Sequence, residues 1–429
     1  MTVVCPAYML LGYNNAVMGG LLDLESFVEL FPQTDTFLAG RVLLGIGFGF
    51  ISATVPVWQS ECAPAERRGA LVVLEGVFAS AGLALSQWIN LGLYFASGSI
   101  SWRFPIAFPI IFAGCMLAAL PFQPDSPRWL MKKGRVAEAK RVLAAIHDEP
   151  EDSEMISDKI RKMEYSLKEA SKGSFASIFS SKKGRLLTRT LLAMFSTFSQ
   201  QLNGIGIIGF YTTVIYSSLL GLSPVTSRVL SGSTYVFQFF CSFIVFYTID
   251  RIGRRKLMMF GTIGMGLTFI ILTPLIANAP HSKPCAGAAA AFVFIFTMFF
   301  SVGALGINYL YGAEIAPLAH RIQIYSLSTV TLWTFNFLVV EVTPSGFSNL
   351  GYKFFIVFAA TNLFLLTPVV YFFFPETQKR SLEDIDAIFL TAKSALDVPK
   401  VSKQLPQISI LELDDASADS GKIETKHQE

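Results

Sequence analysis

A four-residue pattern occurs twice in this chain, each time where a long apolar run ends. Residues 61–64 read Glu-Cys-Ala-Pro and residues 314–317 read Glu-Ile-Ala-Pro, each followed by an arginine one turn later. A second pair, Pro-Asp-Ser-Pro-Arg at 124–128 and Pro-Glu-Thr-Gln-Lys at 375–379, recurs at nearly the same spacing of about 250 residues. Two unrelated motifs displaced by one distance indicate a tandem duplication, and parallel repeats of helical membrane segments are typical of secondary transporters. Transport is therefore the leading hypothesis.

The composition is that of a membrane protein. Of the 429 residues, 52% are hydrophobic and 15% are charged, which is too apolar for a soluble protein of this length. The 5 cysteines are an odd number and lie mostly in or beside apolar runs, so we expect buried thiols rather than a disulfide framework. The first apolar run contains Asn14 and Asn15 and has no basic segment before it, so a membrane segment is expected there rather than a cleavable signal peptide.

Ten apolar runs are long enough to cross a bilayer core of about 30 Å, which takes about 20 helical residues. They are 3–22, 36–58, 70–95, 103–122, 190–219, 229–249, 257–277, 286–312, 322–343 and 352–374. The sequence therefore predicts an all-α membrane protein with about ten transmembrane helices.

Lys and Arg are distributed unevenly among the connections between these runs. Nearly all basic residues outside the runs lie in every second connection, and the connections between these contain only Lys283. The basic connections are 59–69, 123–189, 250–256, 314–321 and the residues after 375. Because cytoplasmic loops are enriched in Lys and Arg, this set and both termini are predicted to be cytoplasmic.

The runs divide the chain into four segments. We expect a shortened N-terminal bundle of four spans at 1–122, a cytoplasmic linker at 123–189, a six-helix bundle at 190–374 and a cytoplasmic tail at 375–429. Apolar residues at helical spacing predict amphipathic helices in the linker, with too few apolar residues for a core of their own. The tail beyond about residue 391 is acidic, Ser-rich and without periodicity, so we expect it to be disordered.

Motifs in order along most of the chain carry a resemblance to a known family. They lie at 12–20, 40–45, 56–61, 124–130, 200–211, 250–255, 314–317, 333–336 and 375–383. In this order they resemble the sugar porter family of the major facilitator superfamily, most closely its fungal sugar and polyol members. The resemblance implies a fold of two helical bundles with six spans each.

The first half is short by comparison with that pattern. The late motifs of the two halves are about 250 residues apart, but the first spans, near residues 3 and 190, are only about 190 residues apart. The missing length falls before Gly40 and equals about two helices with their loops. The sequence therefore predicts four spans followed by six, with the second and third spans of the family pattern absent. The Asp-Arg-x-Gly-Arg-Arg motif at 250–255 has no counterpart in the first half for the same reason.

The resemblance also implies a substrate site, because sugar porters hydrogen-bond sugar hydroxyls at the positions of Gln200 and Gln201. Carboxamides suit this role because they offer both donors and acceptors. Polar contact between helices is the alternative role for these side chains. Gly206 stands where the family usually has Asn, and Tyr309 stands where it usually has Trp. The complete candidate site is Gln200, Gln201, Asn203, Tyr211, Tyr309, Trp333 and Asn336.

Asn14 decides the expected energetics. Proton-coupled sugar porters resemble this segment but carry Asp there, near an arginine that corresponds to Arg41. An amide cannot titrate, so Asn14 favours facilitated diffusion, with proton-coupled symport as the alternative. Two other carboxylates lie in spans. Glu75 is interpreted as a structural partner of the nearby basic cluster, and Glu341 as a side chain that reaches the interface.

Charged residues at the predicted cytoplasmic ends form a separate group. In the family, ion pairs among these motifs resemble a latch that holds the cytoplasmic side closed and opens during the transport cycle. The predicted members of this cytoplasmic gate are Glu61, Arg68, Asp250, Arg254, Arg255, Glu314 and Arg321.

The sequence thus predicts a sugar or polyol transporter that works by alternating access in a lipid bilayer, as a monomer in the plasma membrane. A transporter-like nutrient sensor and a non-functional truncated form remain the alternatives. We expect no enzymatic activity, cofactor or metal, because the four histidines lie in loops or the tail and none is near a cysteine or carboxylate cluster. No nucleic-acid partner is expected; the partners are a small-molecule sugar or polyol, with protons as the alternative co-substrate.

Overall fold

The computed structural model describes residues 2–21, 27, 35–62, 68–96, 98–171, 175–180, 185–378, 380 and 382–405. All regular secondary structure in these residues is helical, in agreement with the all-α prediction. The N-terminal half contains α1 (Val4–Leu21), α3 (Asp35–Cys62), α4 (Arg68–Tyr94), α5 (Ile100–Ala107), α6 (Pro109–Ala119) and η2 (Leu120–Phe122). Next come α7 (Pro127–Lys132), α8 (Val136–His147), α9 (Glu154–Ser171) and η3 (Phe175–Phe179).

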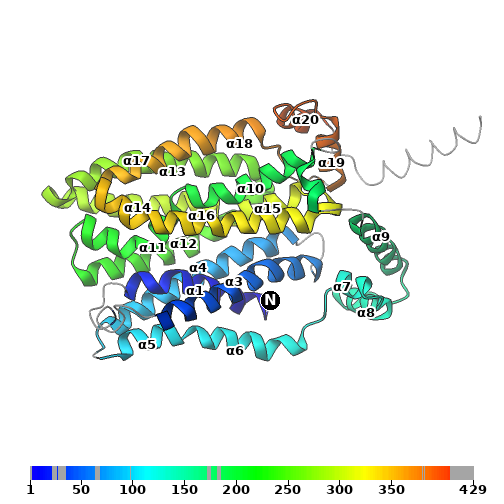
Figure 1. The fold of residues 1–429 in the computed structure, drawn as a ribbon, viewed down its shortest axis with the longest axis horizontal. Helices are drawn as coiled ribbons and strands as arrows, with labels where there is room; N and C mark the ends of the chain where they lie inside the picture. The colour runs from blue at the N-terminus through cyan, green and yellow to red at the C-terminus, as the bar shows by residue number, and fades with distance from the viewer. Residues whose placement is uncertain are drawn as a thin grey trace, which may run out of the picture.

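The C-terminal half is the larger helical group. It contains α10 (Leu186–Leu202), α11 (Ile205–Val214), η4 (Ile215–Leu219), α12 (Pro224–Ile252), α13 (Arg254–Asn278), η5 (Ala279–His281), α14 (Lys283–Gly303), α15 (Ile307–Ile315), η6 (Leu318–His320), α16 (Arg321–Leu350), η7 (Gly351–Lys353), α17 (Phe354–Ala360), η8 (Thr361–Leu366) and α18 (Thr367–Phe373). The chain then forms α19 (Leu382–Thr391) and α20 (Val398–Gln404). In Figure 1 the two halves lie side by side, with α7–α9, α19 and α20 all at one end of the bundle.

Seven stretches of the described chain are long and apolar enough to cross a membrane. They are Phe37–Gln59, Ile100–Phe122, Leu186–Leu219, Pro224–Ile252, Arg254–His281, Lys283–Ile315 and Arg321–Phe373. The last has 53 residues and reverses direction at Gly351, where a φ of +54° suits glycine. It therefore forms a helical hairpin from α16 and α17–α18 (Figure 1). Helices α1 and α4, also predicted as spans, pack in the same bundle but are not among the seven.

Glycines allow the closest helix contacts. A Cβ atom at Gly12 would overlap the carbonyl of Ala79, and one at Gly82 would overlap the carbonyl of Met9, so α1 and α4 touch through their backbones. Likewise, a Cβ at Gly261 on α13 would lie 2.7 Å from the Cα of Gly303 on α14. Small residues at such contacts let helices pack tightly in lipid, where burial of apolar surface gives little driving force.

Two helical stretches of the N-terminal half are poorly covered. In the most apolar part of Phe37–Gln59 only 6% of residues are buried, and in Ile100–Phe122 only 17% are, against 39% or more in the other five candidate spans. Gly40, Gly45 and Gly47 on α3 have no neighbouring atoms within 4 Å of a Cβ position. Glycines that let helices approach closely are here without an approaching helix. This open face is what the absence of two spans from this half would leave.

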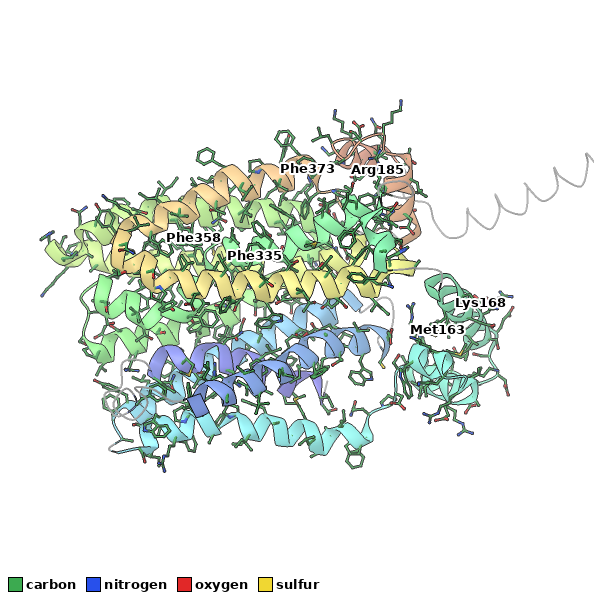
Figure 2. All side chains as sticks on the ribbon, viewed as in Figure 1. Met163, Lys168, Arg185, Phe335, Phe358 and Phe373 are labelled. Atoms are coloured by element: carbon green, nitrogen blue, oxygen red, sulfur yellow. The ribbon has the colours of Figure 1, made fainter. Side chains whose placement is uncertain are left out.

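The predicted linker forms short helices that pack on one another, and α9 also contacts η6. Leu130, Leu143, Ile156 and Ile160 form a small apolar cluster that joins α7, α8 and α9 to each other. Figure 2 shows Met163 and Lys168 on α9, which stands beyond the end of the bundle together with α7 and α8. The apolar faces of these short helices are therefore covered mainly by one another.

The start of the tail is ordered, which corrects the prediction of disorder beyond about residue 391. Helix α20 begins at Val398, which is fully buried, and Arg380 donates to the carbonyls of Ser402 and Leu405. Arg189 on α10 pairs with Asp386 on α19 and lies 4.4 Å from the ring centroid of Phe389. A few apolar and charged anchors on the bundle thus hold a segment whose own composition predicts no structure. Residues 406–429, also predicted to be disordered, lie outside the described residues.

The halves also touch at the end of the bundle away from α7–α9. There Arg228 on α12 donates to the carbonyl of Gly20, next to the last residue of α1, at 2.7 Å. Its guanidinium lies 4.5 Å from the ring centroid of Tyr94 on α4, and its side chain is buried. Helix α1 also packs against α11 at this end.

Candidate substrate cavity

A cavity lies between the two halves, with an empty volume of about 1140 Å³ that includes open solvent. Residues from α1, α3 and α4 line one side, and residues from α10, α11, α12, α14, α15 and α16 line the other. Five of the seven predicted substrate-binding residues line it: Gln200, Gln201, Tyr309, Trp333 and Asn336. Its size and its mixture of apolar walls with few polar groups are usual for small-molecule sites.

A break between α10 and α11 presents the two glutamines to the cavity. Helix α10 ends at Leu202, and Gly204 adopts a φ of +97° before α11 begins. Glycine suits this left-handed conformation, and a ring atom of Phe269 would lie 2.6 Å from any Cβ there. Interrupted helices near the middle of the membrane leave polar groups available to a substrate.

Asn203 serves this break instead of the cavity, contrary to the prediction that it could share the site. Its Oδ1 accepts a hydrogen bond from the backbone N–H of Ile205 at 2.9 Å, and its carbonyl accepts one from Asn362 Nδ2 at 2.9 Å. The side chain is 1% exposed and does not line the cavity. It therefore caps the start of α11.

Tyr211 is likewise placed outside the cavity lining. Its hydroxyl donates to the carbonyl of Val340 at 3.2 Å, and its ring packs edge-on against Phe347. Tyr211 itself has a non-helical φ of −116°, which marks a kink in α11. This local turn directs the ring toward α16 rather than into the cavity.

The other predicted residues form polar pairs around the cavity. Asn336 Nδ2 donates to Gln201 Oε1 at 3.0 Å, which joins α16 to α10. Trp333 Nε1 donates to Ser52 Oγ at 3.4 Å, which joins the two halves. The Tyr309 hydroxyl is hydrogen-bonded to Gln200. The aromatic rings among them offer faces on which the C–H surface of a pyranose can stack.

Three buried oxygen atoms in the cavity wall have no hydrogen-bond partner in the described part of the chain. They are Gln200 Oε1, Gln238 Oε1 and Glu75 Oε1. Buried acceptors are normally satisfied, and leaving one unpaired costs about 1–3 kcal/mol. Acceptors that converge on a cavity are suited to a ligand that brings several O–H donors. Sequence reasoning missed Gln238, and only its place as a polar residue within a predicted span could have indicated it.

The predicted coupling residues are not joined. Asn14 is buried, and its Nδ2 donates to the carbonyl of Leu10 within α1. Its neighbour Asn15 lines the cavity, whereas Asn14 does not. Among the described contacts there is no hydrogen bond between Asn14 and Arg41 on α3. An amide that returns its donor to its own helix has little reason to engage a guanidinium.

The charged groups of the predicted cytoplasmic gate pair mainly within one half. Arg254 Nη1 lies 2.8 Å from Asp250 Oδ1, and Arg254 Nη2 lies 3.0 Å from Glu314 Oε1. The Glu376 carboxylate accepts from the backbone N–H groups of Arg254 and Arg255 at 2.8 and 3.2 Å. All of these residues belong to the C-terminal half or the segment that follows it. The contacts of this cluster therefore stabilise the C-terminal half, and its role as a latch stays a prediction.

Of the remaining gate residues, Glu61 has a local partner. In the N-terminal half Glu61 accepts from the Ser126 hydroxyl, so the two motifs of that half meet. Arg68 and Arg321 begin α4 and α16, and the side chain of Arg68 lies outside the described residues. Among the residues that the structure describes, no cluster of His, Cys, Asp and Glu side chains could hold a metal ion.

Two helical halves around a central cavity, with a few polar groups in an apolar wall, are the arrangement of a membrane carrier of the major facilitator type. The family model "Sugar (and other) transporter" matches residues 26–389. The chain belongs to this family of sugar transporters, as its motifs predicted.

Individual relatives agree. The chain is 37% identical over 388 residues to the MFS-type transporter oryC of Aspergillus oryzae, covering 89% of this chain and 71% of that protein. It is 34% identical over 415 residues to the sugar transporter STL1 of Saccharomyces cerevisiae, covering 95% of this chain and 71% of that protein. These relatives are named as transporters and not as enzymes, which is consistent with the prediction of no enzymatic activity.

Solved structures support the fold. The proton:xylose symporter XylE bound to 6-bromo-6-deoxy-D-glucose matches with a TM-score of 0.73 and 22% identity, covering 90% of this chain and 82% of that one. An inward open conformation of XylE from E. coli matches with a TM-score of 0.63 and 21% identity. The fold is therefore the all-helical major facilitator fold.

Proposed function

We propose that this protein carries a sugar or polyol across the membrane by alternating access, with the substrate held in the cavity between the halves. The observation that supports this most is the set of three unpartnered acceptor oxygens, on Gln200, Gln238 and Glu75, in the wall of one cavity. A neutral ligand with several hydroxyl groups satisfies them without bringing a charge into the membrane. Contributions to the lining from both halves suit a site around which the halves rock.

We further propose that both termini face the cytoplasm and that the membrane is the plasma membrane. The uneven distribution of Lys and Arg supports this orientation. The position of α7–α9, α19 and α20 at one end of the bundle supports it too, because these polar helices then share one aqueous compartment (Figure 1).

The mode of transport has two candidates. Asn14 cannot bind and release a proton, which supports facilitated diffusion. Proton-coupled symport is the second candidate because a different titratable group, Glu75, lines the cavity and is 5% exposed.

Binding and flux measured on the purified protein test the proposed function. Trp333 lines the cavity, so its fluorescence is expected to change on titration with glucose, xylose or glycerol. The Trp333→Phe variant is expected to lose this change. Trp129, exposed on α7 outside the bundle, serves as the control: its fluorescence is present in both proteins and remains as background. Uptake of the same labelled solutes into proteoliposomes is expected in addition to binding. Binding without uptake would support the nutrient-sensor alternative, and absence of both would support a non-functional form.

A further inference from the structure

Glu75 has an unusual position for a carboxyl group within a membrane-spanning helix. It lies on α4 and is 5% exposed, and its Oε1 has no hydrogen-bond partner in the described residues. It lines the same cavity as Gln200 and Gln201. An ionisable group buried in a membrane protein is costly, so it is usually paired or functional.

The groups that face Glu75 do not supply a positive charge. The Tyr8 hydroxyl of α1 is hydrogen-bonded to its carboxyl group, and Tyr309 of α15 and Tyr325 of α16 are close enough to interact with it electrostatically. From α12 the cavity receives Tyr235 and Gln238. Among the described residues that line the cavity, Glu75 is the only charged one.

Glu75 was interpreted as a partner of the cytoplasmic basic cluster, but the side chain of Arg68 in that cluster lies outside the described residues. No basic side chain among those described is paired with it. Within the described part of the chain, an ionised carboxylate in this cavity would have hydroxyl groups around it but no counter-ion. A proton removes that uncompensated charge and turns the group into both a hydrogen-bond donor and an acceptor.

We propose that Glu75 is the proton-binding residue of the substrate cavity, so that binding of a sugar or polyol is linked to protonation of Glu75. This inference rests on the proposed function, since it concerns the same cavity. The carboxylate takes one proton from the aqueous side to which the cavity is open. The resulting O–H donates to a substrate hydroxyl oxygen, and the carbonyl oxygen accepts from a second hydroxyl. Release of the substrate on the other side allows the proton to leave to water, which restores the carboxylate.

The linkage is reciprocal. If substrate binds the protonated form more tightly, then substrate raises the proton affinity of Glu75 by the same factor. A carrier whose loaded form holds one proton and one neutral solute performs symport. Asn14 is not required to titrate in this scheme, so the two observations are compatible.

The test compares wild-type protein with Glu75→Gln, which keeps the shape and polarity of the side chain without the titration. Binding of glucose, xylose and glycerol is measured by calorimetry from pH 5 to pH 10, in two buffers with different ionisation enthalpies at each pH. At pH values above the range in which Glu75 titrates, wild-type protein is expected to take up close to one proton per bound solute. Its affinity is expected to fall by up to about tenfold per pH unit in that range. Glu75→Gln is expected to bind with no proton uptake and with an affinity independent of pH.

Glu341→Gln is the matched control, because Glu341 is an exposed carboxylate on α16 outside the cavity lining. It is expected to keep the wild-type pH dependence. Binding by wild-type protein without proton uptake would overturn the linkage while leaving the proposed function intact. Proton uptake retained in Glu75→Gln, or lost in Glu341→Gln, would also overturn the assignment to Glu75.

Infrared spectroscopy detects protonation of Glu75 directly and does not depend on transport. The carbonyl band of a protonated, buried carboxylic acid is expected to shift when solute binds to wild-type protein and to be missing from Glu75→Gln. If none of the probe solutes binds, the proposed function fails and the linkage fails with it. A titrating band that solute leaves unchanged contradicts the linkage alone.

Discussion

Replacement of Gln200 by Ala is expected to weaken substrate binding by about 1–3 kcal/mol, a factor of about 5–150 in the dissociation constant. Gln200 Oε1 lies in the cavity wall and has no hydrogen-bond partner among the described residues, so its loss removes an acceptor that is available to the ligand. A substrate hydroxyl left unpaired in a desolvated site bears most of this cost. The folded protein loses the contact between Gln200 and Tyr309, which contributes about 0.5–1.5 kcal/mol, a loss independent of the substrate.

Gln201→Ala provides the comparison that separates substrate binding from polar contact between helices. Gln201 Oε1 already accepts from Asn336, so this change also removes a bond that joins α10 to α16. We expect Gln201→Ala to lower both the affinity, again by about 1–3 kcal/mol, and the melting temperature. Gln200→Ala should lower the affinity with little change in melting.

Calorimetric titration and thermal melting of both variants are the assays. Leu191→Ala on the same helix is the control, because Leu191 is 55% exposed and does not line the cavity. Unchanged affinity in Gln200→Ala would refute the argument from unpartnered acceptors. Unchanged affinity together with lower melting in Gln201→Ala would favour the purely structural role for that residue.

Three further predictions concern packing, pH and the short first half. Gly82→Val is expected to destabilise the protein by more than about 3 kcal/mol in thermal melting, because a Cβ there would overlap the backbone of α1, whereas Gly92→Val, with open space around it, should have little effect. Burial lowers the pKa of His320 below its ordinary value of 6.5, so the unfolded chain binds more protons there and stability is lost as the pH falls from that value. His320→Gln should therefore reduce the difference in melting temperature between pH 7.5 and pH 5.5, and an unchanged difference would contradict this. Genomic sequence between the codons for Phe31 and Arg41 is expected to encode about two further apolar spans, and an uninterrupted exon there would show that the deletion is genuine.

The sequence predicted the cavity better than it predicted the charges. Gln200 and Trp333 were identified because a motif fixes them to one side of a helix, and a helix transmits such positions reliably. Asn203 does not line the cavity because α10 ends at Leu202, just before it, and helical spacing no longer fixes where its side chain lies. The tyrosines around Glu75 could not be predicted, because the position of Glu75 along its helix says nothing about which neighbouring helices surround it.

Pairings between segments far apart in the chain were the least predictable. Arg254 finds Glu314 and the Glu376 carboxylate accepts from its backbone, yet each motif read alone fits a contact across the halves equally well. Helix α20 at residues 398–404 is held by the hydrogen bonds of Arg380 and by the burial of Val398, which the local composition does not indicate. Such contacts are tertiary and leave no periodic signal in the sequence.

The contact of Arg228 with the carbonyl of Gly20 bears on how easily the halves separate at that end. The guanidinium sits where the chain leaves α1, at the negative end of the helix dipole, and Tyr94 covers it. When this end opens, water can replace the carbonyl as a partner of the charge, so rehydration offsets much of what the contact provides. The contact between Arg228 and the Gly20 carbonyl is therefore stabilising while water is excluded, and its loss costs little free energy once water enters. A contact of this kind lets the form of a carrier that is closed at this end and the form that is closed at the other end remain close in free energy, so that substrate binding can shift the equilibrium between them.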